Sequence, residues 1–221
     1  NRPLGITDYL PLEQLVGVTA EDRLGDMLVT TERFGRTQPN LTLLDSPTAP
    51  ILGSPSGRPF FLTGFEEHTE LVEGRWPVPG AMQDPTTEGD IETVLGPESA
   101  RKMGYDVGDR IFLIPSRGSS ERVTFKVVGL ANPIDHREEY WMGAPIYFDL
   151  RAVGESVVVP LFVNEEDYFQ GIGARYPTLV GDFGFYLFLD AAHLTESNAN
   201  HVKQQVLGVE TDINKVYPRT L

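Results

Sequence analysis

The feature that most constrains the fold is the stretch from residue 91 to residue 114, where three short elements follow one another directly. Residues 91–95 alternate in polarity as a strand does. Pro97 suits the first turn of a helix, and Gly104 is a typical helix stop. Residues 107–114 contain a Gly-Asp turn and then an apolar segment. The stretch predicts a strand, a short helix and a second strand, without a nucleophile motif, metal cage or phosphate loop.

Further strand-like segments lie on both sides of this stretch. Residues 60–65 and 71–74 precede it, and residues 122–129 and 145–149 follow it. The segment at 122–129 is expected to form a hairpin with the strand before it, through a loop of about six residues. Residues 60–150 are therefore predicted to be mostly β.

The last third of the chain has a different pattern. Residues 156–163 are dense in β-branched side chains, and Asn164 is placed to cap a short helix whose first turn is acidic. Residues 183–189 form an aromatic-rich strand, and Thr195 is a candidate cap for a helix over 196–207. Strand–helix–strand–helix is an α/β-type order.

Taken together, these segments predict an α+β fold for a single domain, residues 1–221. A β-rich subdomain is expected at 60–150, and an α/β subdomain is expected from 1–59 together with 151–221. The first sixty residues carry the least local signal, since residues 12–18 fit either a strand or a short helix.

The chain is strongly acidic, which limits its partners. It has 32 acidic and 18 basic residues, a net charge of −14 and a pI of about 4.6. Such a surface repels phosphate backbones, so no nucleic-acid partner is expected, and it disfavours flat adsorption onto anionic lipid headgroups. The absence of cysteine excludes disulfides, thiol catalysis and zinc–thiolate sites.

No segment has the length of a membrane span. The longest purely apolar run, Val157 to Val163, has seven residues, whereas a spanning helix needs about 20. The chain begins with Asn1 and has no apolar leader at that end, so we expect it to be a piece of a longer protein whose membrane anchors lie outside these residues.

Patterns for metal binding and hydrolysis are weak. The histidines at 68, 136, 193 and 201 show no ligand spacing, and the acids Asp84, Glu88 and Asp90 do not match an EF-hand. A hydrated acidic loop is favoured at 84–90, and ion binding there is left open. The stretch 53–57 resembles a serine-hydrolase elbow but has proline, Pro55, in place of the nucleophile. We expect no catalytic residue, metal or cofactor.

Two tryptophans are the candidate contacts for a partner. Trp76 precedes Pro77 and Trp141 lies before Met142-Gly143, so each sits near a turn. Burial between subdomains is the simpler interpretation of both. The functional alternative is an exposed anchor, because tryptophan is enriched at the centres of protein interfaces.

Five motifs, in this order, resemble those of the MacB-like periplasmic core domain of FtsX/MacB-family ABC transporter permeases. They are the Gly-Arg strand end in 72–77, the strand and helix in 94–104, the Val-Gly-Asp turn in 107–111, the Phe-x-Val-Val-Gly strand in 125–130, and the strand 186–190 with the helix after it. Each motif alone is common, and their order and spacing together carry the resemblance.

The resemblance implies a non-catalytic domain outside the membrane, anchored through the parent permease. Its partners would be the permease transmembrane helices and a cytoplasmic ATPase, whose motion would reach the domain as rigid-body shifts. Cargo or an outside partner would be a peptide, a lipoprotein, a lipid-linked molecule or a cell-wall hydrolase. The family lends no catalytic residue to this chain.

Two other functions remain open from the sequence. One is a free-standing extracellular module that binds carbohydrate or peptide, with Trp76, Tyr140 and Trp141 as contacts. The other is a hydrolase that uses two distant acids, because the separation of carboxylates does not follow from sequence. Flanking apolar segments in the parent gene would favour the permease domain over both.

Overall fold

The computed structural model describes residues 6–38, 41–44, 55–79, 90–114, 122–142, 147–153, 156–174, 176 and 180–217. The fold class is α+β, as predicted. Contacts divide the chain into two compact units, Asn1–Arg33 with Phe183–Leu221, and Phe34–Asp182. We call the first the helical unit and the second the barrel unit.

These bounds differ from the expected subdomains. Residues 34–59 and 151–182 belong with the barrel unit, although we expected them in the α/β part. The reason is long-range strand pairing, because strands on both sides of the 60–150 segment pair with strands inside it.

Six strands of the barrel unit form a closed ring. In the ring order β3-β2-β6-β7-β5-β9, each strand is hydrogen-bonded to the next, and β9 pairs back with β3. The pairs β3–β9 and β5–β7 are parallel, and the other four are antiparallel. The bounds are β2 Leu41–Leu44, β3 Ser56–Leu62, β5 Ile91–Leu95, β6 Arg110–Ile114, β7 Val123–Pro133 and β9 Ser156–Phe162.

The register sends one set of side chains into the ring. A Cβ on Gly57 of β3 would lie 2.6 Å from the side chain of Leu113 on β6, which is not a neighbouring strand, so this face points inward. Strand residues alternate between faces, and following the pairing around the ring identifies the inner set. Its fully or nearly fully buried members include Leu41, Ile91, Thr93, Ile111, Leu113, Val123, Phe125, Val127 and Leu161.

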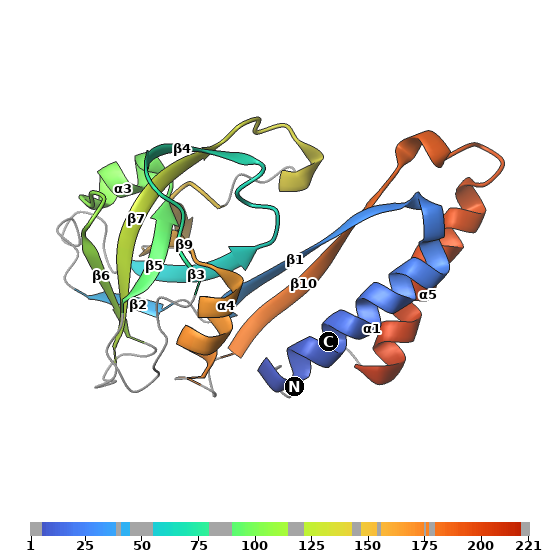
Figure 1. Ribbon diagram of the computed structural model, residues 1–221, viewed down its shortest axis with the longest axis horizontal. Helices are drawn as coiled ribbons and strands as arrows, with labels where there is room; N and C mark the ends of the chain where they lie inside the picture. The colour runs from blue at the N-terminus through green and yellow to red at the C-terminus, as the bar shows by residue number, and fades with distance from the viewer. Residues whose placement is uncertain are drawn as a thin grey trace. The chain divides into compact units, whose positions relative to one another are not determined.

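Shorter elements are attached to the ring (Figure 1). β4 (Thr69–Gly74) pairs with the far end of β7, and β8 (Arg151–Val153) pairs with β9. The helix α3 (Pro97–Met103) begins with Pro97 and ends at Gly104 in the left-handed conformation, as predicted. Two further segments are the single turn η2 (Glu139–Trp141) and α4 (Glu165–Asp167), which Asn164 caps by accepting from the Glu166 backbone and which continues into η3 (Tyr168–Gly173).

In the helical unit, α1 (Ile6–Leu24) packs along α5 (Ala199–Val216) (Figure 1). Ala20 and Leu24 of α1 form a small core with Val209 of α5. Arg23 adds an ion pair, since its Nε lies 2.8 Å from Asp212 Oδ2. The remaining elements are η1 (Gly25–Met27), the first part of β1 (Leu28–Gln38), most of β10 (Val180–Leu189) and η4 (Ala191–His193).

β1 and β10 are the two places where the chain passes from one unit to the other. The unit boundaries fall at 33/34 inside β1 and at 182/183 inside β10, and the two strands are neighbours in the sheet. The Asp190 amide donates to Met27 O near one end, and Arg36 pairs with Asp182 near the other, as strands of opposite direction do.

Three local predictions need correction or refinement. Residues 12–18 lie in the helix α1, and residues 147–149 form a turn, not the end of a strand. The last helix begins at Ala199 after Asn198, because Thr195 Oγ1 accepts the Asn198 amide in the turn before the helix. Among the described helices, none is long and apolar enough to span a bilayer.

Candidate functional site

The two tryptophans singled out in the sequence meet at one phenylalanine. Trp141 in η2 and Trp76, which follows β4, both pack edge-on against Phe65, with ring centroids 5.9 and 6.1 Å away. Phe65 stacks on Phe162 of β9 at 4.0 Å. Residues from four separate segments therefore share one cluster.

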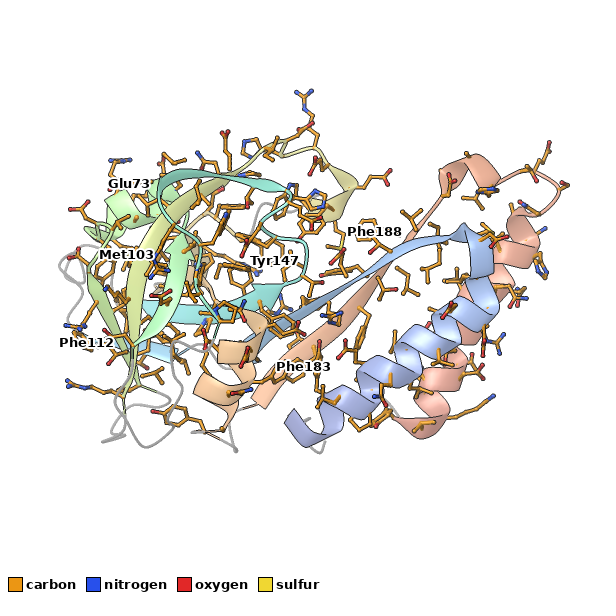
Figure 2. All side chains as sticks on the ribbon, in the orientation of Figure 1. Glu73, Met103, Phe112, Tyr147, Phe183 and Phe188 are labelled. Atoms are coloured by element: carbon orange, nitrogen blue, oxygen red, sulfur yellow. The ribbon has the colours of Figure 1, made fainter. Side chains whose placement is uncertain are left out.

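This aromatic cluster lies outside the ring. Phe162 pairs with Phe60 in the register, and both alternate with the residues that face the ring interior. Aromatic pairs of this kind add about 0.5–1.5 kcal/mol each beyond their buried area. The cluster consists of Phe60, Phe65, Trp76, Trp141, Tyr147, Phe148 and Phe162, of which Tyr147 is labelled in Figure 2.

The two tryptophans differ in exposure. Trp141 is 1% exposed, and its Nε1 has no hydrogen-bond partner among the described residues. In this conformation the Trp141 ring is out of a partner's reach, and its role is to fill the cluster. Trp76 is only half-buried, so part of its ring remains available for contact.

A second group secures the turn that carries Trp141. The His68 ring stacks on Tyr140 with centroids 3.8 Å apart, and His68 Nδ1 lies 2.8 Å from Glu138 Oε2. The Tyr140 hydroxyl donates to Thr63 O over 2.7 Å. These contacts hold η2 in place, and Tyr140 is buried and offers little surface.

Two of the motifs noted in the sequence meet where β4 ends against β7. Gly74 has φ +77°, and a Cβ there would overlap the Val128 carbonyl oxygen of β7. A Cβ on Gly129 would overlap the Arg75 carbonyl oxygen. The Gly-Arg strand end and the glycine of Phe-x-Val-Val-Gly therefore serve one purpose, the close approach of two backbones.

Arg75 then reaches across to Glu92 of β5. The guanidinium makes two hydrogen bonds to the carboxylate, and the Val78 amide donates a third over 2.9 Å. The Arg75 hydrogen bond, followed by the Val78 amide bond and the Arg75 charge, holds the pKa of Glu92 below its usual range, although partial burial opposes the shift.

Of the three acids noted at 84–90, only Asp90 lies among the described residues. Asp84 and Glu88 lie outside the described residues, and Asp90 pairs with Arg110 Nε at 2.7 Å. Within the ranges that the structure describes, no three His, Asp or Glu side chains are grouped closely enough to hold a metal ion. Of the other histidines, His193 lies 3.0 Å from Asp190 and His136 is exposed.

A cluster of arginines was not anticipated from the sequence. Arg36, Arg58 and Arg151 line one small cavity that is partly open to solvent, with Phe60, Tyr147, Val158 and Pro160 as the rest of its wall. Burial, then the charges of Arg36 and Arg151, lower the pKa of Arg58 from its usual value, and Asp182 opposes this. The three arginines are far apart in sequence, so no local pattern joins them.

Comparisons with known proteins give one structural neighbour to report. No protein-family model matches the chain, and no curated protein matches it. The neighbour is the crystal structure, at 2 Å, of a domain of a protein named as a permease, from Porphyromonas gingivalis. It is 14% identical with a TM-score of 0.42, and the match covers 86% of this chain and 68% of that one. At that TM-score we draw no conclusion about fold or function from it.

Proposed function

We propose that the chain is a non-catalytic extracytoplasmic domain of an ABC transporter permease, of the MacB/FtsX type. Its role would be to couple movement of transmembrane helices to cargo export or to an extracellular partner. The observation that carries the proposal is the chain topology. The first and last described helices, α1 and α5, pack together, and the barrel unit is inserted between them through β1 and β10.

This topology suits mechanical coupling. The helical unit is joined to the barrel unit by two covalent connections, both within strands of one sheet. In this proposal, displacement of α1 or α5 would be passed on through them. Interstrand hydrogen bonds restrict the backbone of both strands at these connections. The convergence of the Gly-Arg and Phe-x-Val-Val-Gly motifs on one junction gives further support, since these motifs carried the family resemblance.

In this proposal the partners are the transmembrane helices of the parent permease and a cytoplasmic ATPase. A peptide, a lipoprotein or a cell-wall hydrolase would be the cargo or the outer partner. Trp76 is our candidate contact for that partner, because its ring is only partly buried while Trp141 is enclosed.

The first test concerns the parent polypeptide in its own cells. We expect apolar segments of about 20 residues on each side of this chain. We also expect protease added outside the membrane to cut this domain in the membrane-anchored protein. Recovery of the parent as a freely secreted or cytoplasmic protein without such segments would contradict the proposal.

The second test restrains the helical unit. Because the chain lacks cysteine, Ala20→Cys with Val209→Cys introduces one thiol pair at the α1–α5 contact. In the complete transporter, oxidation should lower ATP hydrolysis, and reduction should restore it. The control pair, Ala152→Cys with Val157→Cys, joins register partners in β8 and β9 and should have no effect. Equal ATP hydrolysis for both oxidised pairs would count against coupling through the helices.

The exposure of Trp76 also favours a second candidate, a free-standing module that binds carbohydrate or peptide extracellularly. Under this alternative, the chain would bind a member of a glycan or peptide array, and Trp76→Ala would abolish binding without unfolding the protein. A parent lacking membrane segments together with such binding would replace the permease proposal.

A further inference from the structure

The arginine cluster is built by the register of four neighbouring strands. Arg36 of β1 pairs with Phe60 of β3, and Arg58 lies two residues before Phe60 on the same face. Across the next pairing, Arg58 is opposite Pro160 of β9. Two residues before Pro160, Val158 pairs with Arg151 of β8. All three guanidinium-bearing residues therefore stand on the outer face of the ring.

The wall beneath them is apolar. Phe60 and Val158 are almost completely buried, and the Tyr147 ring lies 5.0 Å from that of Phe60. Charges beside such a wall are screened less than charges in open water. Three guanidiniums held there repel one another, which is costly unless anionic groups lie among them.

One anionic group of the chain is already engaged. Asp182 Oδ2 accepts from Arg36 Nε over 2.9 Å and from its Nη2 over 2.5 Å. Asp182 therefore supplies an anionic partner within the cluster. Arg151 is exposed at the cavity rim on the short strand β8, so the cluster is open to solvent on that side.

We propose that Arg36, Arg58 and Arg151 form a binding site for a phosphate group. A guanidinium matches the oxygens of phosphate with a two-pronged set of hydrogen bonds. A phosphate monoester carries between one and a half and two negative charges near neutral pH, which suits several arginines better than a single carboxylate does. The site is independent of the transport role proposed above, and it is a local exception on a strongly acidic chain.

The primary test uses inorganic phosphate and the full 221-residue chain at constant ionic strength. We expect phosphate to raise the Tm saturably, because a ligand that binds only the folded state stabilises it. Arg151→Gln should weaken phosphate binding, raising the dissociation constant measured by calorimetry at least tenfold. Arg137→Gln is the matched control, since Arg137 is an exposed arginine of the same unit outside the cavity, and it should leave binding unchanged.

Arg151→Gln is the main test variant, because Arg151 is exposed and its replacement should not disturb folding. Arg58→Gln should also weaken phosphate binding, but Arg58 is partly buried and its replacement risks misfolding. The proposal is overturned if phosphate gives no saturable stabilisation. It is also overturned if Arg151→Gln and Arg137→Gln bind equally, or if succinate binds more tightly than phosphate.

A vesicle assay separates the two sources of a phosphate group. Vesicles of phosphatidylcholine with phosphatidic acid are compared with vesicles of phosphatidylcholine alone, in co-sedimentation with the same variants. Binding to the first kind that is lost in Arg151→Gln identifies a lipid headgroup. Arg151-dependent binding of free phosphate without vesicle binding identifies a soluble ligand. Absence of both overturns the proposal.

Discussion

Arg75 and Glu92 connect two strands that lie on opposite edges of β7. Around Gly129 and Leu130, β7 pairs with β4 on one side and with β5 on the other. Arg75 follows β4 directly and reaches the Glu92 carboxylate with two hydrogen bonds, one of them 2.6 Å long. The Glu92 side chain is 12% exposed and that of Arg75 is 51% exposed, so the acid is held within the structure and the base closes over it.

Replacing Glu92 with glutamine should lower the free energy of unfolding by about 1.5 kcal/mol, the lower end for hydrogen bonds to charged groups. The lower end applies because water screens the half-exposed Arg75. Chemical denaturation measures this difference. Glu70→Gln, an exposed acid on β4, is the control and should change stability little. A loss from Glu70→Gln as large as that from Glu92→Gln would contradict the assigned role.

The same ion pair predicts a dependence on pH. The pKa of Glu92 is lower in the folded state than in the unfolded state, chiefly through its hydrogen bond from Arg75. Its stabilising contribution is therefore complete above the unfolded pKa and is lost as pH falls through the folded pKa. The difference in unfolding free energy between wild type and Glu92→Gln should shrink on acidification from neutral pH. A difference that stays constant down to strongly acidic pH would exclude this linkage.

Gly74→Ala and Gly17→Ala should change stability in opposite directions. Gly74 has φ +77° and no room for a Cβ, so alanine should cost about 1–3 kcal/mol from backbone strain alone. Gly17 lies in α1 with nothing within 4 Å of its Cβ position, so alanine there should stabilise the helix by up to about 1 kcal/mol. Thermal unfolding of the two variants checks the pair, and equal Tm shifts would refute the contrast.

Trp141→Ala should destabilise the barrel unit by about 3–5 kcal/mol, since a large, fully buried ring is removed. Trp76→Ala should cost less, because its ring is only half-buried. Denaturation followed by far-ultraviolet circular dichroism gives both values without relying on tryptophan emission. If Trp76→Ala lowered the free energy of unfolding more than Trp141→Ala does, the partly buried Trp76 ring would contribute more to packing than its burial indicates.

Local signals in the sequence were sufficient for the elements between 91 and 133. Pro97 and Gly104 bound α3 as expected, and β6 and β7 form the predicted antiparallel pair. Asn164 caps α4 by the expected side-chain hydrogen bond. Each of these features depends on residues close together in the chain, which is why composition and spacing alone were informative.

Closure of the ring was not predictable in the same way. It depends on the parallel pairing of β3 with β9, which joins residues about one hundred positions apart, such as Gly57 and Val159. Nothing near either strand specifies the other as a partner. The arginine cavity was not predictable from the sequence for the same reason. Arg36, Arg58 and Arg151 become neighbours only once β1, β3, β9 and β8 are aligned.

The division of the helical unit between the two ends of the chain affects the order of its synthesis. About 175 residues separate the end of α1 at Leu24 from the start of α5 at Ala199. At the usual rate of translation, the synthesis of α5 begins on the order of 10 to 35 seconds after that of α1 is complete. During that interval Ala20 and Leu24 lack Val209, so the apolar face that they form on α1 is not yet covered by α5. The inserted barrel unit, by contrast, is encoded without interruption and is complete before α5 emerges.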